Sequence, residues 1–455
     1  MTEGPILRKM LLFVYPLIIT NVLQHLYSAA DNAVVGQFVG ASALAAVGAT
    51  GPATSLILNL LIGVSAGANI VNSNLLGAKK FKELRKSMHT SIAIGFTGGL
   101  AVSVLGILVG KWLLQLMSCP DNILNDATLY LRIIFCGTPA TMVYNYGSGI
   151  LRTHGDSQRP MYIMAVSGLV NVGLNLVFVL VLHMSVAGVA LATIISKYIA
   201  AAWVITILFN PKGDYKLRFA EVKLYPKQSL NIIKIGLPCG LNPLVFSISN
   251  ATVQSAVNGF GDIVVAGSVA SANITGMIYQ VLAAFYSCCI NFSGQCSGAG
   301  KYKRIDKVAL LSSGICVAFV SVCSTVLTLF PGTFISLFNT DPQVIATGTE
   351  KLIIMAWSYV LYGISEAVMG CLRGLRKTTV PSVINIFCVC AVRVLWVWLV
   401  CPFAPESQRL LFMCYPVSYL LSASTLVIYF IHVRRQLDRK QLLKQQNASK
   451  ISTQN

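Results

Sequence analysis

A single carboxylate lies in a long apolar stretch near the start of the chain: Asp31, in the segment YSAADNAVVG at residues 27–36. A carboxylate in apolar surroundings is costly, so such residues commonly bind an ion or carry a proton. Asn171 and Asn175 are four positions apart in NVGLNLVFV, and helical geometry would place them on one face, a turn apart. The alternative for Asp31 is a structural one, in which its carboxylate reaches water at the end of its helix.

Two further charges, Glu366 and Arg393, occur in apolar segments near the end of the chain. Their side chains are expected at similar depths, so a structural ion pair is the favoured interpretation. The alternative is that both line a cavity, where a substrate breaks the pair.

The composition indicates a membrane protein. The chain of 455 residues is 55% hydrophobic and 11% charged, whereas soluble globular proteins carry about 25% charged residues. Stretches of about 20 apolar residues recur along the whole length, and each is long enough to cross a bilayer as a helix. The sequence therefore predicts an all-α polytopic membrane protein in the cell membrane.

We expect twelve transmembrane helices, at residues 10–36, 43–74, 88–114, 127–151, 160–183, 186–209, 229–257, 263–295, 308–330, 347–371, 380–402 and 410–433. Most of the 34 Lys and Arg residues fall at the amino terminus, in the even-numbered loops or in the final tail. Positive charge stays on the cytoplasmic side, so both termini are predicted to be cytoplasmic. The net charge of +19 then reflects topology, and no nucleic-acid partner is expected.

Three collinear matches indicate an internal duplication. GILRTHGDSQRP at 149–160 matches GCLRGLRKTTVP at 370–381 with an offset of 221 residues, and GAKKFK matches GAGKYK at the same offset. Pro16 matches Pro238 to within one residue of that offset. We expect two six-helix bundles, at 1–209 and 229–433, joined by a cytoplasmic linker at 210–228 and followed by a basic cytoplasmic tail at 434–455.

A parallel duplication of this kind favours a transporter over other classes of membrane protein. Such repeats place a substrate site at their interface and exchange access between the two sides. A channel would be expected to show a filter sequence. An enzyme would need a convergent acid–base or metal constellation, and the five His residues are scattered. A receptor is not supported by a duplicated twelve-helix core, so the protein is not expected to be an enzyme, a channel or a receptor.

The chain resembles the multidrug and toxic compound extrusion (MATE) family of bacterial type. The resemblance covers essentially the whole length and depends on ADNAVVGQFVGASALAAVGATGP, GAKKFKELRK, LRTHGDSQRP, GQCSGAGKYKR and GCLRGLRKTTVP. It implies a V-shaped pair of bundles around a large cavity. It also implies export of amphiphilic, often cationic, small molecules in exchange for Na⁺ or H⁺, with no other cofactor. A flippase or metabolite exporter of the same superfamily is the alternative.

The resemblance also implies a cation-coupling site in the first half, at Asp31, Asn171, Asn175 and Thr193. These side chains provide hard oxygen ligands of the kind that alkali cations prefer. The alternative for the two asparagines is hydrogen bonding between helices alone. Pro16, fifteen residues before Asp31, is expected to let the first helix bend. No metal is expected beyond Na⁺ at Asp31, and no ion site is expected in the second half, where Thr275 replaces a family glutamate.

Lys197 departs from the family pattern, which usually has an uncharged residue at this position. It lies one turn beyond Thr193, so its ammonium is expected to reach Asp31 and take the place of an external cation. The alternative is that Lys197 extends to the cytoplasmic surface.

Several large side chains are candidates for an adaptable substrate cavity, as in promiscuous binders: Tyr144, Tyr146, Phe246, Met277 and Tyr279. Packing within the bundle or against lipid is the alternative for each of them. The expected partners are small amphiphilic molecules and the lipid bilayer, and the protein is expected to be a monomer.

Overall fold

The fold was analysed in a computed structural model, which describes residues 1–117, 119–210, 217–404 and 406–452. In these residues the chain forms helices joined by short loops and contains no strand. By packing it divides into two units, which are described separately. The amino-terminal unit comprises Arg8–Leu244, and the carboxy-terminal unit comprises Met1–Leu7 with Val245–Asn455.

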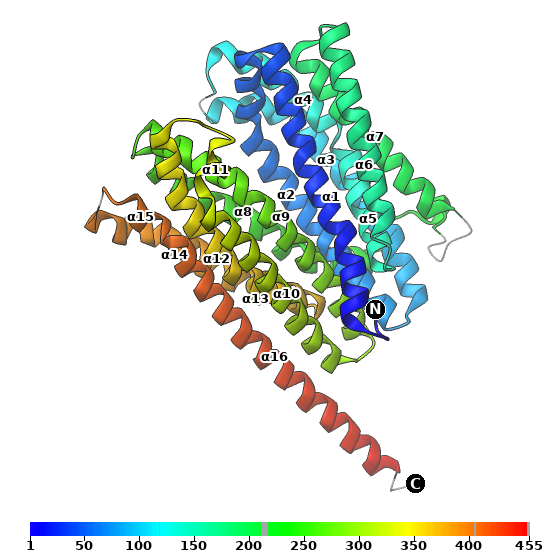
Figure 1. The fold of residues 1–455 in the computed structure, drawn as a ribbon. Coiled ribbons are helices and arrows are strands. Elements are labelled where there is room, and N and C mark those ends of the chain that lie inside the picture. The colour runs from blue at the N-terminus through cyan, green and yellow to red at the C-terminus, as the bar shows by residue number, and fades with distance from the viewer. Residues whose placement is uncertain (118, 211–216, 405, 453–455) are drawn as a thin grey trace. The chain divides into compact units, whose positions relative to one another are not determined.

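The first part of the chain, up to the end of α8, contains the following helices, with the longest labelled in Figure 1: α1 Ile6–Val34, η1 Val35–Val39, α2 Ala41–Gly77, α3 Phe81–Leu116, α4 Asp121–Cys136, α5 Thr138–Thr153, α6 Gln158–Leu176, η2 Val177–Val181, α7 Ser185–Phe209, η3 Phe219–Glu221 and α8 Pro226–Asn258. Two of these, η1 and η2, are π-helical turns. They directly extend α1 and α6, the helices that carry Asp31 and Asn175. Single π-helical turns of this kind are frequent at functional sites.

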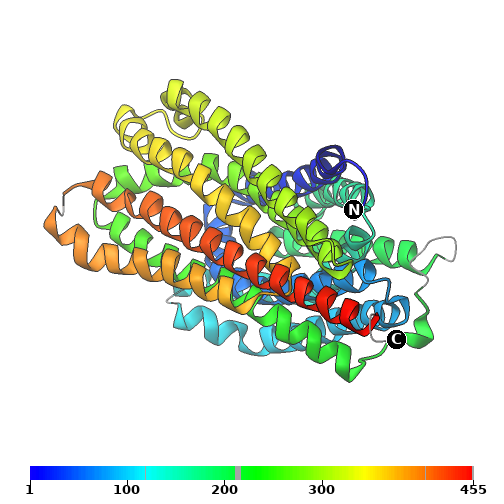
Figure 2. The same cartoon turned by 90° about the horizontal axis from the view of Figure 1, so that it is seen from below.

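The second part contains α9 Asp262–Gly298, α10 Tyr302–Leu329, α11 Pro331–Ser336, α12 Pro342–Gly374, α13 Thr379–Asn385, η4 Ile386–Ala391, α14 Val392–Leu395, η5 Trp396–Val400, η6 Cys401–Phe403, α15 Gln408–Phe412 and α16 Cys414–Ser452. In Figure 2, α16 (red) lies alongside the helical segment 379–403 (orange), with which it makes contacts. Arg434 of α16 is held by a bidentate ion pair with Asp306 on α10, at 2.5 and 2.9 Å.

Eleven helices in the described residues are long and apolar enough to cross a membrane, and they coincide with eleven of the twelve predicted spans. The remaining span, predicted at 127–151, is formed by two shorter helices, α4 and α5, which meet at Gly137. Pro139 in the first turn of α5 has no backbone N–H, so the helical hydrogen bonding of α4 cannot run on through this point. Within a membrane, only structures that satisfy their own backbone are stable, and helices do so.

Backbone geometry supports the internal duplication. Three pairs of residues adopt positive φ at the same offset that relates the sequence motifs: Gly40 and Gly261, Lys79 and Gly300, and Gly155 and Arg376. A non-glycine residue at positive φ is uncommon. Each half therefore has positive φ angles at the same connections between equivalent helices, even where one copy has lysine or arginine in place of glycine.

The division between the units falls inside α8, later than the predicted linker. The part of α8 up to Leu244 packs with the amino-terminal helices, through glycines that allow direct backbone contact with α2. A methyl group on Gly63 would overlap the backbone of Gly240, and one on Gly67 would overlap the backbone of Gly236. The assignment of all of 229–257 to the second bundle therefore does not describe how α8 packs.

The described part of the predicted linker packs against α3. Arg85 donates to Glu221 at 2.7 Å, and the ring nitrogen Nε2 of His89 accepts the backbone N–H of Arg218 at 3.0 Å. Residues 211–216 of the linker and 453–455 of the tail lie outside the described residues.

Candidate functional site

Asp31 lies near the end of α1 and is almost completely buried. Both of its carboxylate oxygens accept hydrogen bonds from other helices. Asn175 Nδ2 on α6 donates to Oδ1 at 2.6 Å, and Thr193 Oγ1 on α7 donates to Oδ2 at 3.1 Å. Charge-assisted hydrogen bonds of this kind are stronger than those between neutral groups, so they stabilise the buried carboxylate.

Asn171 completes a closed hydrogen-bonded ring. Asn175 Nδ2 also donates to Asn171 Oδ1 at 3.2 Å, and Asn171 Nδ2 is 3.4 Å from Thr193 Oγ1. The structure thus brings together the four residues that the family resemblance had grouped, from three helices. The i, i+4 spacing on α6 places both amides on the face toward Asp31.

The ring offers oxygen atoms suited to a cation. The carbonyl oxygen Oδ1 of Asn175 is buried and accepts no hydrogen bond within the described residues. An unpaired buried acceptor is costly, and a small hard cation in contact with it would satisfy it. The donor types therefore fit Na⁺, although Asp31 is the only carboxylate of the ring.

A cavity of about 520 Å³ opens beside this ring. Its lining comes from α1, α2, α4, α5, α6 and α7, all in the amino-terminal unit, and combines Asp31 and Lys197 with amides, hydroxyls and tyrosine rings. Pockets of this size hold drug-sized molecules.

The sequence analysis missed a polar stripe along α1: Gln24, Tyr27, Ser28, Asp31 and Asn32 all line the cavity. The signal was present, because these residues follow the i, i+3, i+4, i+7, i+8 spacing of one helix face. In addition, the Tyr27 hydroxyl is hydrogen-bonded to the Ser196 hydroxyl on α7.

Lys197 lines the same cavity and is near enough to Asp31 for their charges to interact. In the described part of the chain, however, its ammonium forms neither an ion pair nor a hydrogen bond. The expected contact with Asp31 is therefore not made, and the oxygens of Asp31 accept hydrogen bonds from Asn175 and Thr193 instead.

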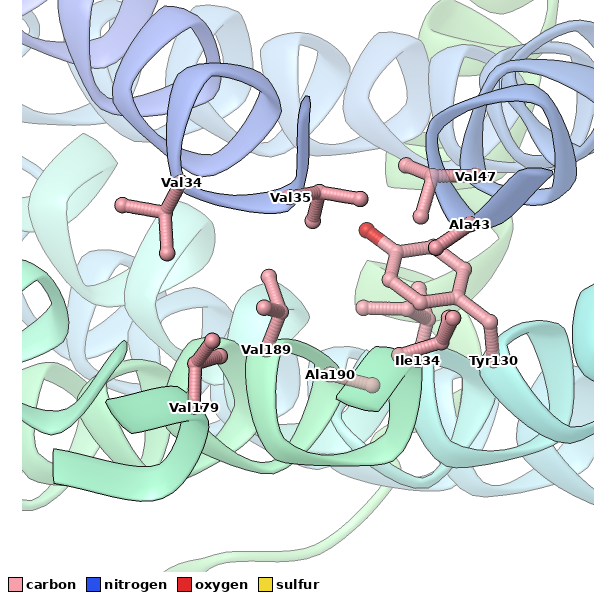
Figure 3. Packing of buried hydrophobic residues seen from close by; sticks show 10 residues of the cluster. Val34, Val35, Ala43, Val47, Tyr130, Ile134, Val179, Val189 and Ala190 are labelled. Atoms are coloured by element: carbon pink, nitrogen blue, oxygen red, sulfur yellow. The ribbon is translucent and has the colours of Figure 1, made fainter. Parts of the chain in front are cut away.

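An apolar cluster packs next to the ring, around the π-helical turn that extends α1. Figure 3 shows Val34 and Val35 facing Val189 of α7, with the ring of Tyr130 beside Val47. Tyr130 also lines the cavity. Close packing of this kind excludes water and lowers the local dielectric, which strengthens the electrostatic interactions of Asp31.

Pro16 lies inside α1, which continues through it as one helix. The Thr20 hydroxyl donates to the carbonyl oxygen of Pro16 at 2.7 Å. Because proline removes one backbone hydrogen bond, α1 is less stiff at Pro16, well before its end at Val34. That α1 bends there remains a prediction.

The predicted cavity residues occupy different environments. Tyr144 lines the cavity and donates to the Pro160 carbonyl at 3.2 Å, whereas Tyr146 is buried against Gly95 of α3. In the carboxy-terminal unit, Met277 is half exposed and Tyr279 stacks on Tyr362. Their role in binding substrate remains a prediction.

The predicted ion pair between Glu366 and Arg393 is not formed among the described residues. Arg393 is fully buried and donates instead to Ser418 Oγ at 3.1 Å and Asn250 Oδ1 at 3.0 Å. Three aromatic rings surround its guanidinium, with centroids 5.1, 4.5 and 4.9 Å away: Phe246, Tyr415 and Tyr419. Hydrogen bonds and cation–π contacts thus replace the carboxylate as partners of this charge.

Comparison with known proteins identifies the family. The MatE family model matches the chain twice, at residues 16–177 and 238–399, and the two matches cover more than half of it. The chain belongs to the MatE family. This confirms the family predicted from the motifs, and with it a multi-pass membrane transporter rather than an enzyme at the level of the family. Each of the two matches begins at a proline, Pro16 and Pro238, which agrees with the duplication.

Individual MatE proteins are similar along most of their length. The probable multidrug resistance protein YoeA of Bacillus subtilis is 26% identical over 445 residues, which is 95% of each chain. The FAD transporter of Shewanella oneidensis is 24% identical over 364 residues, covering 79% of this chain and 80% of its own length.

The fold is also that of solved MatE structures. A multidrug resistance MATE family transporter, solved in an outward-facing conformation, superposes with a TM-score of 0.90 at 19% identity, covering 96% of this chain and 98% of that chain. This likeness shows a shared all-α fold.

Proposed function

We propose that this chain is a secondary active exporter, which moves amphiphilic organic compounds across the cell membrane by alternating access in exchange for Na⁺ or H⁺. The single observation that carries the proposal is the position of Asp31: buried, held by a ring of donors, and lining a cavity large enough for a small molecule. Similar proteins named for multidrug resistance or multidrug export support the direction of transport.

Asp31 can exist in two charge states within the same ring. When it is ionised, Asn175 and Thr193 both donate to it. When Asp31 takes up a proton, its own hydroxyl can donate a hydrogen bond to Thr193 Oγ1. The Thr193 hydroxyl then donates its hydrogen bond to the Val189 carbonyl oxygen, which is 2.9 Å away. The ring therefore accommodates a proton without losing its hydrogen bonds.

Na⁺ would use the same residues in a different way. Asp31 supplies the charge, and the unpaired Oδ1 of Asn175 supplies a second oxygen. Because a cation and a proton need the same carboxylate, they compete with one another. A gradient of either can shift the protein between two conformations, provided that one conformation binds the ion more strongly.

The substrate class is open to two proposals. Cationic amphiphiles are the expectation from the family resemblance. Export of a cellular metabolite is the second candidate, since a similar protein is named as an FAD transporter and the cavity of this chain contains Lys197.

Transport by reconstituted protein tests the coupling. The full chain in liposomes would be assayed for accumulation of ethidium, a cation, and dansylglycine, an anion, under an imposed Na⁺ gradient and then a pH gradient. Asp31→Asn preserves the shape of the side chain and should abolish gradient-driven accumulation of any compound that the wild type moves.

The matched control is Asp126→Asn, which alters an exposed carboxylate on α4 of the same unit and should transport normally. Full gradient-driven transport by Asp31→Asn would refute the role of Asp31 and leave it as an interfacial residue.

A further inference from the structure

Lys197 provides a positive charge that the hydrogen-bonded ring does not use. It lies on α7, one turn beyond Thr193, and lines the cavity. Within the described residues it has no ion pair and no hydrogen bond. Lys197 is half-buried, and an ammonium partly removed from water is favoured by an acceptor that pairs with it. The cavity therefore presents an unpaired cation to whatever enters it.

Asp31 does not neutralise this charge by direct contact. Its two oxygens accept hydrogen bonds from Asn175 and Thr193, and neither forms an ion pair with Lys197 among the described residues. Among the residues that line the cavity, Asp31 and Lys197 carry the only charges. A ligand that reaches Lys197 therefore meets one acidic side chain in the cavity lining, Asp31, whose two oxygens already accept hydrogen bonds.

The rest of the lining defines the other part of the ligand. Tyr27, Tyr130 and Tyr144 present aromatic rings, while Gln24 and Asn145 present amides. Tyrosine rings suit a flat or aromatic body, and the amides suit its polar edge. An ammonium among such groups is the natural partner of a carboxylate, sulfonate or phosphate, because a hydrogen bond between two charged groups is stronger than one between neutral groups.

We propose that Lys197 is a specificity-determining residue of the transport cavity, and that it selects amphiphilic compounds that carry an acidic group. The inference rests on the proposed function only in taking this cavity as part of the transport route. It narrows the substrate class away from simple organic cations, which the Lys197 ammonium repels.

Equilibrium binding to the purified full chain in dodecyl maltoside tests this proposal. Three probes share one fluorophore and differ in charge: dansylglycine is anionic, dansylamide is neutral and dansylcadaverine is cationic. Wild-type protein should bind dansylglycine on the order of tenfold more tightly than dansylamide, and dansylcadaverine most weakly. Lys197→Gln should remove this preference, and Lys197→Arg should keep it, because the charge remains.

Lys111→Gln is the control, since it removes one positive charge from an exposed position on α3 of the same unit and should leave the preference unchanged. Thermal unfolding of each variant verifies that it is folded. If Lys197→Gln does not fold, the order of the wild-type affinities for the three probes and the result for Lys197→Arg still test the proposal. Wild-type protein that binds dansylglycine no better than dansylamide refutes the proposal, as does a folded Lys197→Gln that retains the preference.

Adding phosphatidylglycerol to the micelles distinguishes the source of the acidic group. Displacement of dansylglycine by this lipid supports an anion site that a lipid headgroup occupies, and no displacement supports a site for a free acidic compound. No ion gradient is present in these measurements. The binding preference at Lys197 can therefore be measured even if Asp31 does not couple transport to an ion. Conversely, absence of the anion preference would not change the result expected for Asp31→Asn in the transport assay.

Discussion

A second carboxylate in the ring should convert a weak Na⁺ site into a strong one. In the wild type, Asn175 Nδ2 is 2.6 Å from Asp31 Oδ1, so Asn175→Asp would put two carboxylates within about 4 Å of each other. At an effective dielectric of about 20, two unit charges at that distance interact by about 4 kcal/mol. Na⁺ between them would turn this repulsion into attraction. Even half of that energy corresponds to a gain in affinity of more than tenfold.

Thermal unfolding measures this gain directly, because a ligand that binds the folded state stabilises it by an amount set by its concentration and affinity. The unfolding temperature of Asn175→Asp should rise in NaCl relative to choline chloride, and by more than that of the wild type. The rise should be larger at about pH 8 than at about pH 6, because protons compete with Na⁺ for the same carboxylates.

Asn145→Asp is the matched control. Asn145 lines the same cavity, but its Nδ2 donates to the Thr141 carbonyl at 2.9 Å and it does not belong to the ring. It should show no added response to Na⁺. If folded Asn175→Asp responds to Na⁺ no more than the wild type, the oxygen atoms of the ring do not converge on a cation and the assignment of a Na⁺ site is wrong.

The remaining predictions concern the second unit, helix packing and topology. Alanine variants of Glu366 and Arg393, combined in a double-mutant cycle measured by thermal unfolding, should show a coupling energy of less than about 0.5 kcal/mol, whereas two residues in one ion pair would couple by about 0.5–3 kcal/mol. Gly67→Val should lower the free energy of unfolding by about 1–3 kcal/mol or prevent folding, because the new side chain would overlap the backbone of α8. Gly98→Val is the control and should be tolerated, because a Cβ at Gly98 has no neighbouring atom within 4 Å. A cysteine introduced in the loop at 301–307 should react with a membrane-impermeant reagent only from the cytoplasmic side, and labelling from outside would contradict the predicted orientation.

The spans were predictable because apolar length alone determines them in a bilayer. The interruption at Gly137 was not predicted, since a hydropathy window does not register one missing backbone donor at Pro139. The π-helical turns after Asp31 and Asn175 also leave no signal in composition.

The candidate site was predictable in part. Helical spacing placed Asn171 and Asn175 on one face, but grouping them with Asp31 and Thr193 depended on the family resemblance, because sequence spacing gives no contacts between distant helices. The error at Arg393 has the same origin. Its depth in the membrane could be counted along the chain, whereas the direction of its side chain, toward Tyr415 and Tyr419, depends on how the helices rotate against each other.

The glycine contacts between α2 and α8 have a consequence for the biogenesis of the protein. Gly63 and Gly67 are synthesised early, but the backbone that they touch, at Gly236 and Gly240, leaves the ribosome only after the linker has been made. Until then, this face of α2 lies against lipid or against the insertion machinery. A nascent chain that stops after α7 thus contains six spans but lacks α8, which covers the glycine face of α2. Quality-control proteases should recognise such a chain as incomplete.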